Sequence, residues 1–128
     1  SVLDRFLELL EPAVQGFRVG DPNDEATEMG PLVSKGHFEN VAAFLDRSVP
    51  VAFTGSAPEG AGYWMAPTVL LPNRTDRVAR EEIFGPVVSV LPFDDEADAI
   101  ALANDSIFGL SGSIWTRDLG RGIRVARG

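Results

Sequence analysis

"REEIFGPVVSV" (residues 80–90) places two carboxylates side by side, an aromatic ring two residues after the second, and a Gly-Pro step before a run of apolar residues. A nearly continuous apolar run is typical of a strand that is covered on both faces in a parallel sheet. We therefore predict a strand over residues 86–93, with a charged pair and a ring at its entrance. Residues two apart in extended backbone project to the same side, so the side chains of Glu82 and Phe84 are predicted to point in the same direction.

The chain before this strand alternates helical and extended patterns. Apolar residues at helical spacing predict a helix from the start of the chain, which Pro12 should kink or restart. Ser34 is suited to cap a second helix, which should end near Arg47. The other predicted elements are a loop over 19–32, a strand over 49–55, an extended segment over 63–71 that is broken at Pro67, and a short helix over 75–82.

The chain after this strand carries three further patterns. Asp95 is suited to cap a helix whose first turn is acidic, as the helix dipole favours. The segment LSGSIWT (110–116) is predicted to be a strand, and Thr116 is predicted to cap the last helix. The order of elements favours an α/β fold with a mostly parallel sheet and helical crossovers.

The composition excludes several functions. The chain has 128 residues and a net charge of −8, which would repel a nucleic-acid backbone. Its apolar runs are far shorter than the ~20 residues of a membrane span. With no cysteine, the chain has no disulfide, thiolate metal site or thiol nucleophile of its own. We therefore expect small molecules or other proteins as partners, no nucleic acid and no membrane, and a cytoplasmic location, since no signal segment is visible.

The candidate motifs for metal or phosphate chemistry are weak. No phosphate-binding loop occurs, and Gly60 to Gly62 lack the third glycine of a dinucleotide fingerprint. His37 is the single histidine, without the paired spacing that a metal site needs, so we predict no metal. We interpret His37 as a solvated surface residue.

Four collinear stretches carry a family resemblance. Glu81 to Pro86 resemble the E-E-I-F-G-P signature of the NAD(P)-dependent aldehyde dehydrogenase superfamily. The stretches VGDPNDEATEMGPLVS, GYWMAPTVL and ALANDSIFGLSGSIWTRDLGRGIRVAR are similar, in order and spacing, to other segments of that family. The resemblance covers essentially the whole chain.

The resemblance implies what the chain belongs to and what it lacks. In the family, a cysteine attacks the aldehyde, a hydride passes to NAD or NADP, and water releases a carboxylic acid. The cysteine lies upstream of the matched stretch. Residues 1–128 are therefore expected to be a partial catalytic domain, truncated at both ends, that is inactive alone. The resemblance implies a dimer or tetramer for the intact parent.

The resemblance also assigns residues to the cofactor site. It implies that Glu82 accepts hydrogen bonds from the two hydroxyls of the nicotinamide ribose, that Phe84 lies against the nicotinamide, and that Leu110 borders the same pocket. Glu81 should point elsewhere, in a structural or solvated role. No catalytic residue is expected in this chain. The alternatives from the residues alone are that 80–82 form a solvated helix end and that Phe84 and Leu110 are ordinary core.

Two other functions compete with the enzyme fragment. One is a stand-alone, non-catalytic binding or interaction module derived from the same domain, and the other is an unrelated α/β binding domain. The collinear stretches argue against the second. An upstream cysteine and a glycine-rich cofactor domain in the parent gene would distinguish the enzyme from the module. The aldehyde and the choice between NAD and NADP depend on segments outside these residues.

Overall fold

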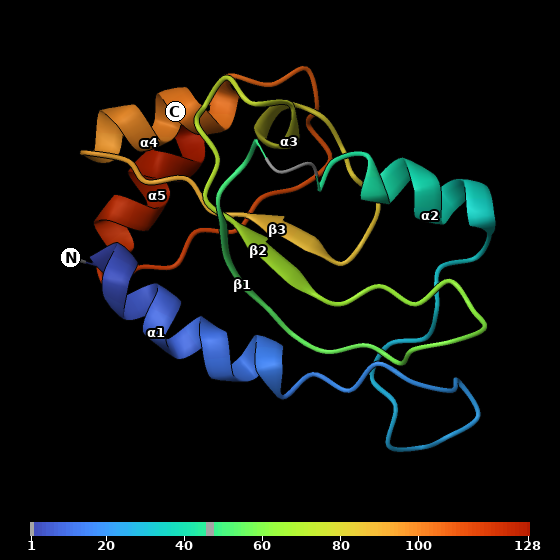
Figure 1. Cartoon of the computed structure of the whole chain (residues 1–128). Coiled ribbons are helices and arrows are strands. Elements are labelled where there is room, and N and C mark those ends of the chain that lie inside the picture. Colours follow the sequence, from blue (N-terminus) through green and yellow to red (C-terminus); the bar gives the residue numbers. More distant parts are fainter. Residues whose placement is uncertain (1, 46–47) are drawn as a thin grey trace. The chain divides into compact units, whose positions relative to one another are not determined.

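A computed structural model describes residues 2–45 and 48–128, and the chain divides into two compact units, Ser1–Leu91 and Pro92–Gly128. The helices and strands confirm the predicted α/β class (Figure 1). The first unit contains α1 (Val2–Gln15), α2 (Lys35–Ala42), β1 (Val51–Thr54), β2 (Thr68–Leu70), α3 (Arg77–Arg80) and β3 (Val87–Ser89). The second unit contains α4 (Glu96–Asn104) and α5 (Leu119–Arg127).

The sheet of the first unit has the strand order β1-β2-β3 and is mixed. β1 and β2 pair antiparallel, whereas β2 and β3 pair parallel, with Thr68 opposite Val87. The connections explain the difference: residues 55–67 contain no helix, while α3 lies between β2 and β3. Parallel neighbours need a crossover of this kind, and antiparallel neighbours do not.

The core of the first unit lies where α3 covers the sheet. Phe44, Val49, Leu70 and Val78 form a buried cluster. Ser89 in β3 donates its hydroxyl to the carbonyl of Val78 at 2.8 Å, which ties α3 to the strand. The expectation that β3 is covered on both faces is wrong, because Val88 is 53% exposed. β3 is an edge strand of this sheet, and an apolar run alone does not show which residues will cover it.

The two long helices of the first unit begin largely as predicted. α1 lies alongside β1 and continues through Pro12 without restarting (Figure 1). Ser34 caps α2, because its hydroxyl accepts a hydrogen bond from the backbone N–H of His37 at 3.1 Å. α2 ends at Ala42, earlier than predicted, and Arg47 lies outside the described residues.

The second unit is held by helix caps and one ion-pair cluster. Asp95 caps α4 as predicted, through the backbone N–H of Asp98 at 2.9 Å. The cap of α5 is Asp118 and not Thr116, because the carboxylate of Asp118 accepts a hydrogen bond from the backbone N–H of Arg121.

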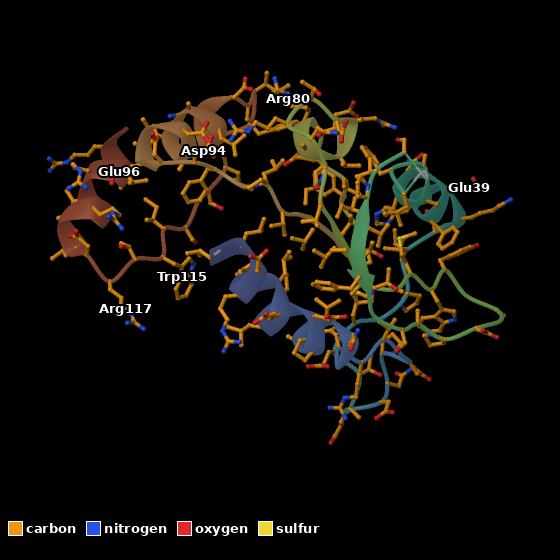
Figure 2. The ribbon with its side chains drawn as sticks, turned by 60° about the vertical axis from the view of Figure 1, so that its left-hand side comes forward. Glu39, Arg80, Asp94, Glu96, Trp115 and Arg117 are labelled. Atoms are coloured by element: carbon orange, nitrogen blue, oxygen red, sulfur yellow. The ribbon has the colours of Figure 1, made fainter. Side chains whose placement is uncertain are left out.

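The predicted strand over 110–116 is also wrong: this segment pairs with no strand of the described chain. Figure 2 shows Trp115 projecting from it.

Glu96 links α4 to α5. Its carboxylate accepts two hydrogen bonds from the guanidinium of Arg124, each at 2.9 Å, and Arg121 lies 3.4 Å away. The hydrogen bond from Arg124 lowers the pKa of Glu96 below its ordinary value of 4.5. The ionised carboxylate is therefore favoured by the folded unit.

We expect this link between α4 and α5 to weaken in acid. Because the pKa of Glu96 is lowered on folding, its contribution is fully present above the ordinary value of 4.5 and is lost as the pH falls through the folded value. The Nε–H signal of Arg124, which donates to Glu96, should report the transition when followed by NMR during an acid titration. In Glu96→Gln the same signal should lose it. A Glu96 carboxyl that titrates at or above its ordinary pKa would contradict the expectation.

Candidate functional site

The segment that joins α3 to β3 exposes one side chain on each side of a half-buried anchor residue. Ile83 packs against the core cluster of the first unit. Its neighbours Glu82 and Phe84 are exposed, and the Phe84 ring is 74% accessible. The interpretation of Phe84 as core is therefore wrong for this structure. The anchor holds the segment on the domain while the acid and the ring remain open to a ligand.

The two adjacent glutamates have different surroundings. Glu81 forms an ion pair with Arg77 on the preceding helix turn, with Oε2 3.0 Å from Nε. Arg77 in turn lies 3.9 Å above the ring of Phe44. Within the described part of the chain, Glu82 has neither an ion pair nor a side-chain hydrogen bond. This agrees with the prediction that Glu81 points elsewhere in a structural or solvated role, and it leaves two acceptor oxygens of Glu82 for another molecule.

The backbone at Phe84 departs from the predicted extended form. Its φ is +53°, in the left-handed region, where aromatic residues are rarely found. The argument that Glu82 and Phe84 project together because the backbone is extended is therefore wrong at this residue. The exposed, half-buried, exposed pattern of residues 82–84 nevertheless remains.

His37 makes a contact that the sequence pattern did not reveal. The interpretation as a solvated surface residue is wrong, because the imidazole is half-buried and its Nε2 lies 2.6 Å from the carbonyl oxygen of Phe84. One helical turn later, Val41 is fully buried, and a Cβ placed on Gly85 would lie only 2.5 Å from Val41 Cγ1. The spacing of His37 and Val41 on one helix face was visible in the sequence, but their partners lie more than 40 residues away.

Leu110 belongs to the second unit and is described apart from Glu82 and Phe84. Its side chain is 94% exposed, so it is not core in this structure. Ile107 and Trp115 nearby in sequence are equally exposed. The structure thus brings two of the three predicted cofactor residues together on one segment and presents the third on another unit.

Other kinds of site are not found in the part of the chain that the structure describes. No group of histidine and acidic side chains there is arranged to hold a metal ion. No helix among residues 2–45 and 48–128 has both the length and the apolar character that a membrane crossing needs. A shallow depression is lined by residues of the 15–27 loop, such as Arg18 and Asp24, and by Ser56. It includes neither Glu82 nor Phe84, so it is not the site that the motifs indicate.

Comparison with known proteins places this geometry in a family. The model of the aldehyde dehydrogenase family matches residues 1–128. Betaine aldehyde dehydrogenase from Rhizobium leguminosarum bv. trifolii is 46% identical over 98% of the chain and 27% of its own length. The corresponding enzyme from Brucella anthropi is 42% identical over 98% of the chain and 28% of its own length.

Solved structures agree. Betaine aldehyde dehydrogenase from Staphylococcus aureus in complex with NAD+ superposes with a TM-score of 0.88 at 35% identity, covering 97% of this chain and 26% of that one. HpcC from Thermus thermophilus gives 0.91 at 31% identity, covering 98% and 27%. The chain therefore spans about a quarter of the length of these relatives. Since the family model matches the whole length of this chain, the chain belongs to the aldehyde dehydrogenase family.

Proposed function

We propose that residues 1–128 act as part of the catalytic domain of an NAD(P)-dependent aldehyde dehydrogenase, which oxidises an aldehyde to a carboxylic acid. The chain spans only 27% of the length of a relative such as the Rhizobium enzyme. We therefore place the nucleophilic cysteine and the dinucleotide-binding domain in the remaining segments of this chain's own parent protein. This chain supplies the nicotinamide-ribose side of the cofactor site and is inactive alone. The relatives named above make betaine aldehyde the first substrate to assay in the parent.

The observation that carries this proposal is the contrast between Glu81 and Glu82. Glu81 is occupied by Arg77, whereas Glu82 has no partner among the described side chains. A carboxylate with two open oxygens fits a vicinal diol such as that of a ribose, and a charged acceptor forms the stronger kind of hydrogen bond. The residues present therefore fit the cofactor that the family uses. When bound, NAD supplies a hydride acceptor.

Phe84 and Leu110 supply the apolar part of the proposed site. The exposed ring of Phe84, two residues from Glu82, offers a wall that limits how far a nicotinamide can shift, and its face can favour a cationic ring. Leu110 presents an exposed isobutyl group from the second unit. In the parent we propose that this group is covered by the cofactor pocket.

The test is Glu82→Gln in the full-length parent. The amide keeps the size of the side chain but removes the charge and one acceptor. Because hydrogen bonds to charged groups contribute about 1.5–3 kcal/mol, hydride transfer should slow by about ten- to a hundredfold, with little change in aldehyde binding. Single-turnover kinetics at varied aldehyde concentration measure the rate of hydride transfer and aldehyde binding, and an equilibrium NAD titration measures cofactor binding.

The matched control is Glu81→Gln. Its carboxylate belongs to an exposed ion pair, which contributes little to stability, so this variant should behave like the parent. Unchanged single-turnover rates in Glu82→Gln at saturating NAD would rule out the role of Glu82. Equal losses in both variants would show that the charge of the segment matters and not the ribose contact.

A further inference from the structure

The segment that carries the proposed cofactor contacts contains a residue in an unfavourable backbone conformation. Phe84 is the only residue other than glycine with positive φ in the described chain, at +53°. A bulky side chain at positive φ is uncommon and persists only where the surroundings hold it in place. The backbone carbonyl group of Phe84 contacts a side chain of α2.

His37 holds that carbonyl. Its Nε2 lies 2.6 Å from Phe84 O, and because a carbonyl oxygen only accepts, the hydrogen is on Nε2. The other ring nitrogen, Nδ1, is buried and has no hydrogen-bond partner among the described residues. A hydrogen on Nδ1 would have no acceptor there, so the geometry assigns the Nε2–H tautomer.

Helix α2 is built to present this imidazole. The backbone N–H of His37 is bonded to the capping hydroxyl of Ser34, which fixes the first turn. Val41, four residues after His37 and on the same face, fills the space beside Gly85. Two consecutive residues of the segment, Phe84 and Gly85, are thus held by one side of α2.

We propose that His37 is a positioning residue for the cofactor site: its hydrogen bond to Phe84 O holds the left-handed turn and thereby sets how the Phe84 ring and Glu82 face the nicotinamide ribose. This inference rests on the proposed function. It requires only an N–H donor at the tip of the residue 37 side chain. Glutamine, which also carries such a donor, should substitute for histidine, whereas alanine should not.

The local structure can be tested without the cofactor, on the 128-residue chain. His37 is the only histidine, so its ring ¹⁵N signals are unambiguous. They should show a hydrogen on Nε2 and a bare Nδ1. The strong intraresidue HN–Hα NOE of a left-handed residue is expected at Phe84, is lost in His37→Ala and is kept in His37→Gln. A hydrogen on Nδ1 with a bare Nε2, or an unchanged NOE in His37→Ala, overturns the inference.

The functional test compares variants in the full-length parent. A net hydrogen bond of ordinary strength predicts that His37→Ala weakens equilibrium NAD binding by about two- to tenfold, with a larger change in KM for NAD than in kcat. His37→Gln should restore binding. Glu39→Gln, on the exposed part of the same helix and paired there only with Lys35, is the control and should leave binding unchanged.

The outcomes separate this inference from the proposed function. If Glu82→Gln weakens NAD binding and His37→Ala does not, His37 has no positioning role and the cofactor assignment stands. If Glu82→Gln changes nothing, the cofactor assignment fails, while the NOE at Phe84 still decides the structural part. A His37→Gln variant as impaired as His37→Ala shows that ring shape matters and overturns the hydrogen-bond account. Should His37→Ala fail to fold, His37→Gln and the ¹⁵N spectrum of the unmodified chain decide the question.

Discussion

Replacing Leu70 with alanine is expected to lower the free energy of unfolding of the first unit by about 2–5 kcal/mol. Leu70 is 1% exposed, lies in the central strand β2 and contacts the buried cluster around Phe44, Val49 and Val78. The substitution removes buried methyl groups and leaves a cavity between the sheet and α3. Few other buried side chains of this size exist in the described chain, so little neighbouring bulk is available to fill the space.

The measurement is urea unfolding followed by tryptophan fluorescence in a Trp115→Phe background. The chain has two tryptophans, and the remaining one, Trp64, belongs to the first unit, so the signal reports that unit. Val88→Ala on the neighbouring strand is the control. Because Val88 is half exposed, its truncation should cost about 1 kcal/mol or less. Equal losses in the two variants would show that the cluster is not the core of the unit.

The features that the sequence predicted correctly depend on short-range interactions. Ser34 and Asp95 cap their helices through N–H groups three residues away, so the residue types and spacing contain the needed information. The strands near residues 51–54 and 87–89 and the short helix near 77–80 lie between clear turn signals, and they were placed to within a few residues.

The sequence predictions that failed concern structures that depend on interaction partners, which a local sequence pattern does not identify. The segment 110–116 alternates in a way that suits a strand, but a strand exists only where a neighbouring chain completes its hydrogen bonds, and no described strand does so. Trp115 and Leu110 of this segment are each 94% exposed. Either Thr116 or Asp118 can accept the capping hydrogen bond, and which of them does so depends on where the helix starts. The helix starts at Leu119, so Asp118 is the cap.

The candidate site divides in the same way. The acid and the ring at Glu82 and Phe84 were identified from their motif, and their exposure agrees with a ligand-facing role that stays a proposal. The contact between His37 and Phe84 joins residues 47 apart, and Phe84 has a left-handed φ that its residue type does not favour. Sequence spacing alone pointed to extended backbone, which tertiary contacts overrode.

Replacing Gly85 with alanine is expected to destabilise the first unit by about 1–3 kcal/mol and to weaken NAD binding by the full-length parent. The added Cβ would lie 2.5 Å from Cγ1 and 2.9 Å from Cγ2 of Val41, which is fully buried and has little room to move. Since α2 is fixed by its cap and its core contacts, the displacement should fall on the segment that carries Glu82 and Phe84. Urea unfolding and equilibrium NAD titration measure the two effects.

The cause can be separated from a general intolerance of alanine by two further variants. Gly36→Ala makes the same chemical change within α2, where a Cβ meets nothing within 4 Å, and should stabilise the helix by up to about 1 kcal/mol. Val41→Ala removes Cγ1 and Cγ2 of residue 41 and leaves only its Cβ, at 3.3 Å from the methyl group added at residue 85. In that background Gly85→Ala should cost less than it does alone, with a coupling of about 0.5–3 kcal/mol. Strict additivity of the two substitutions would show that Gly85 is needed for a reason other than its contact with Val41, and the view of α2 as the support of the cofactor segment would then rest on His37 alone.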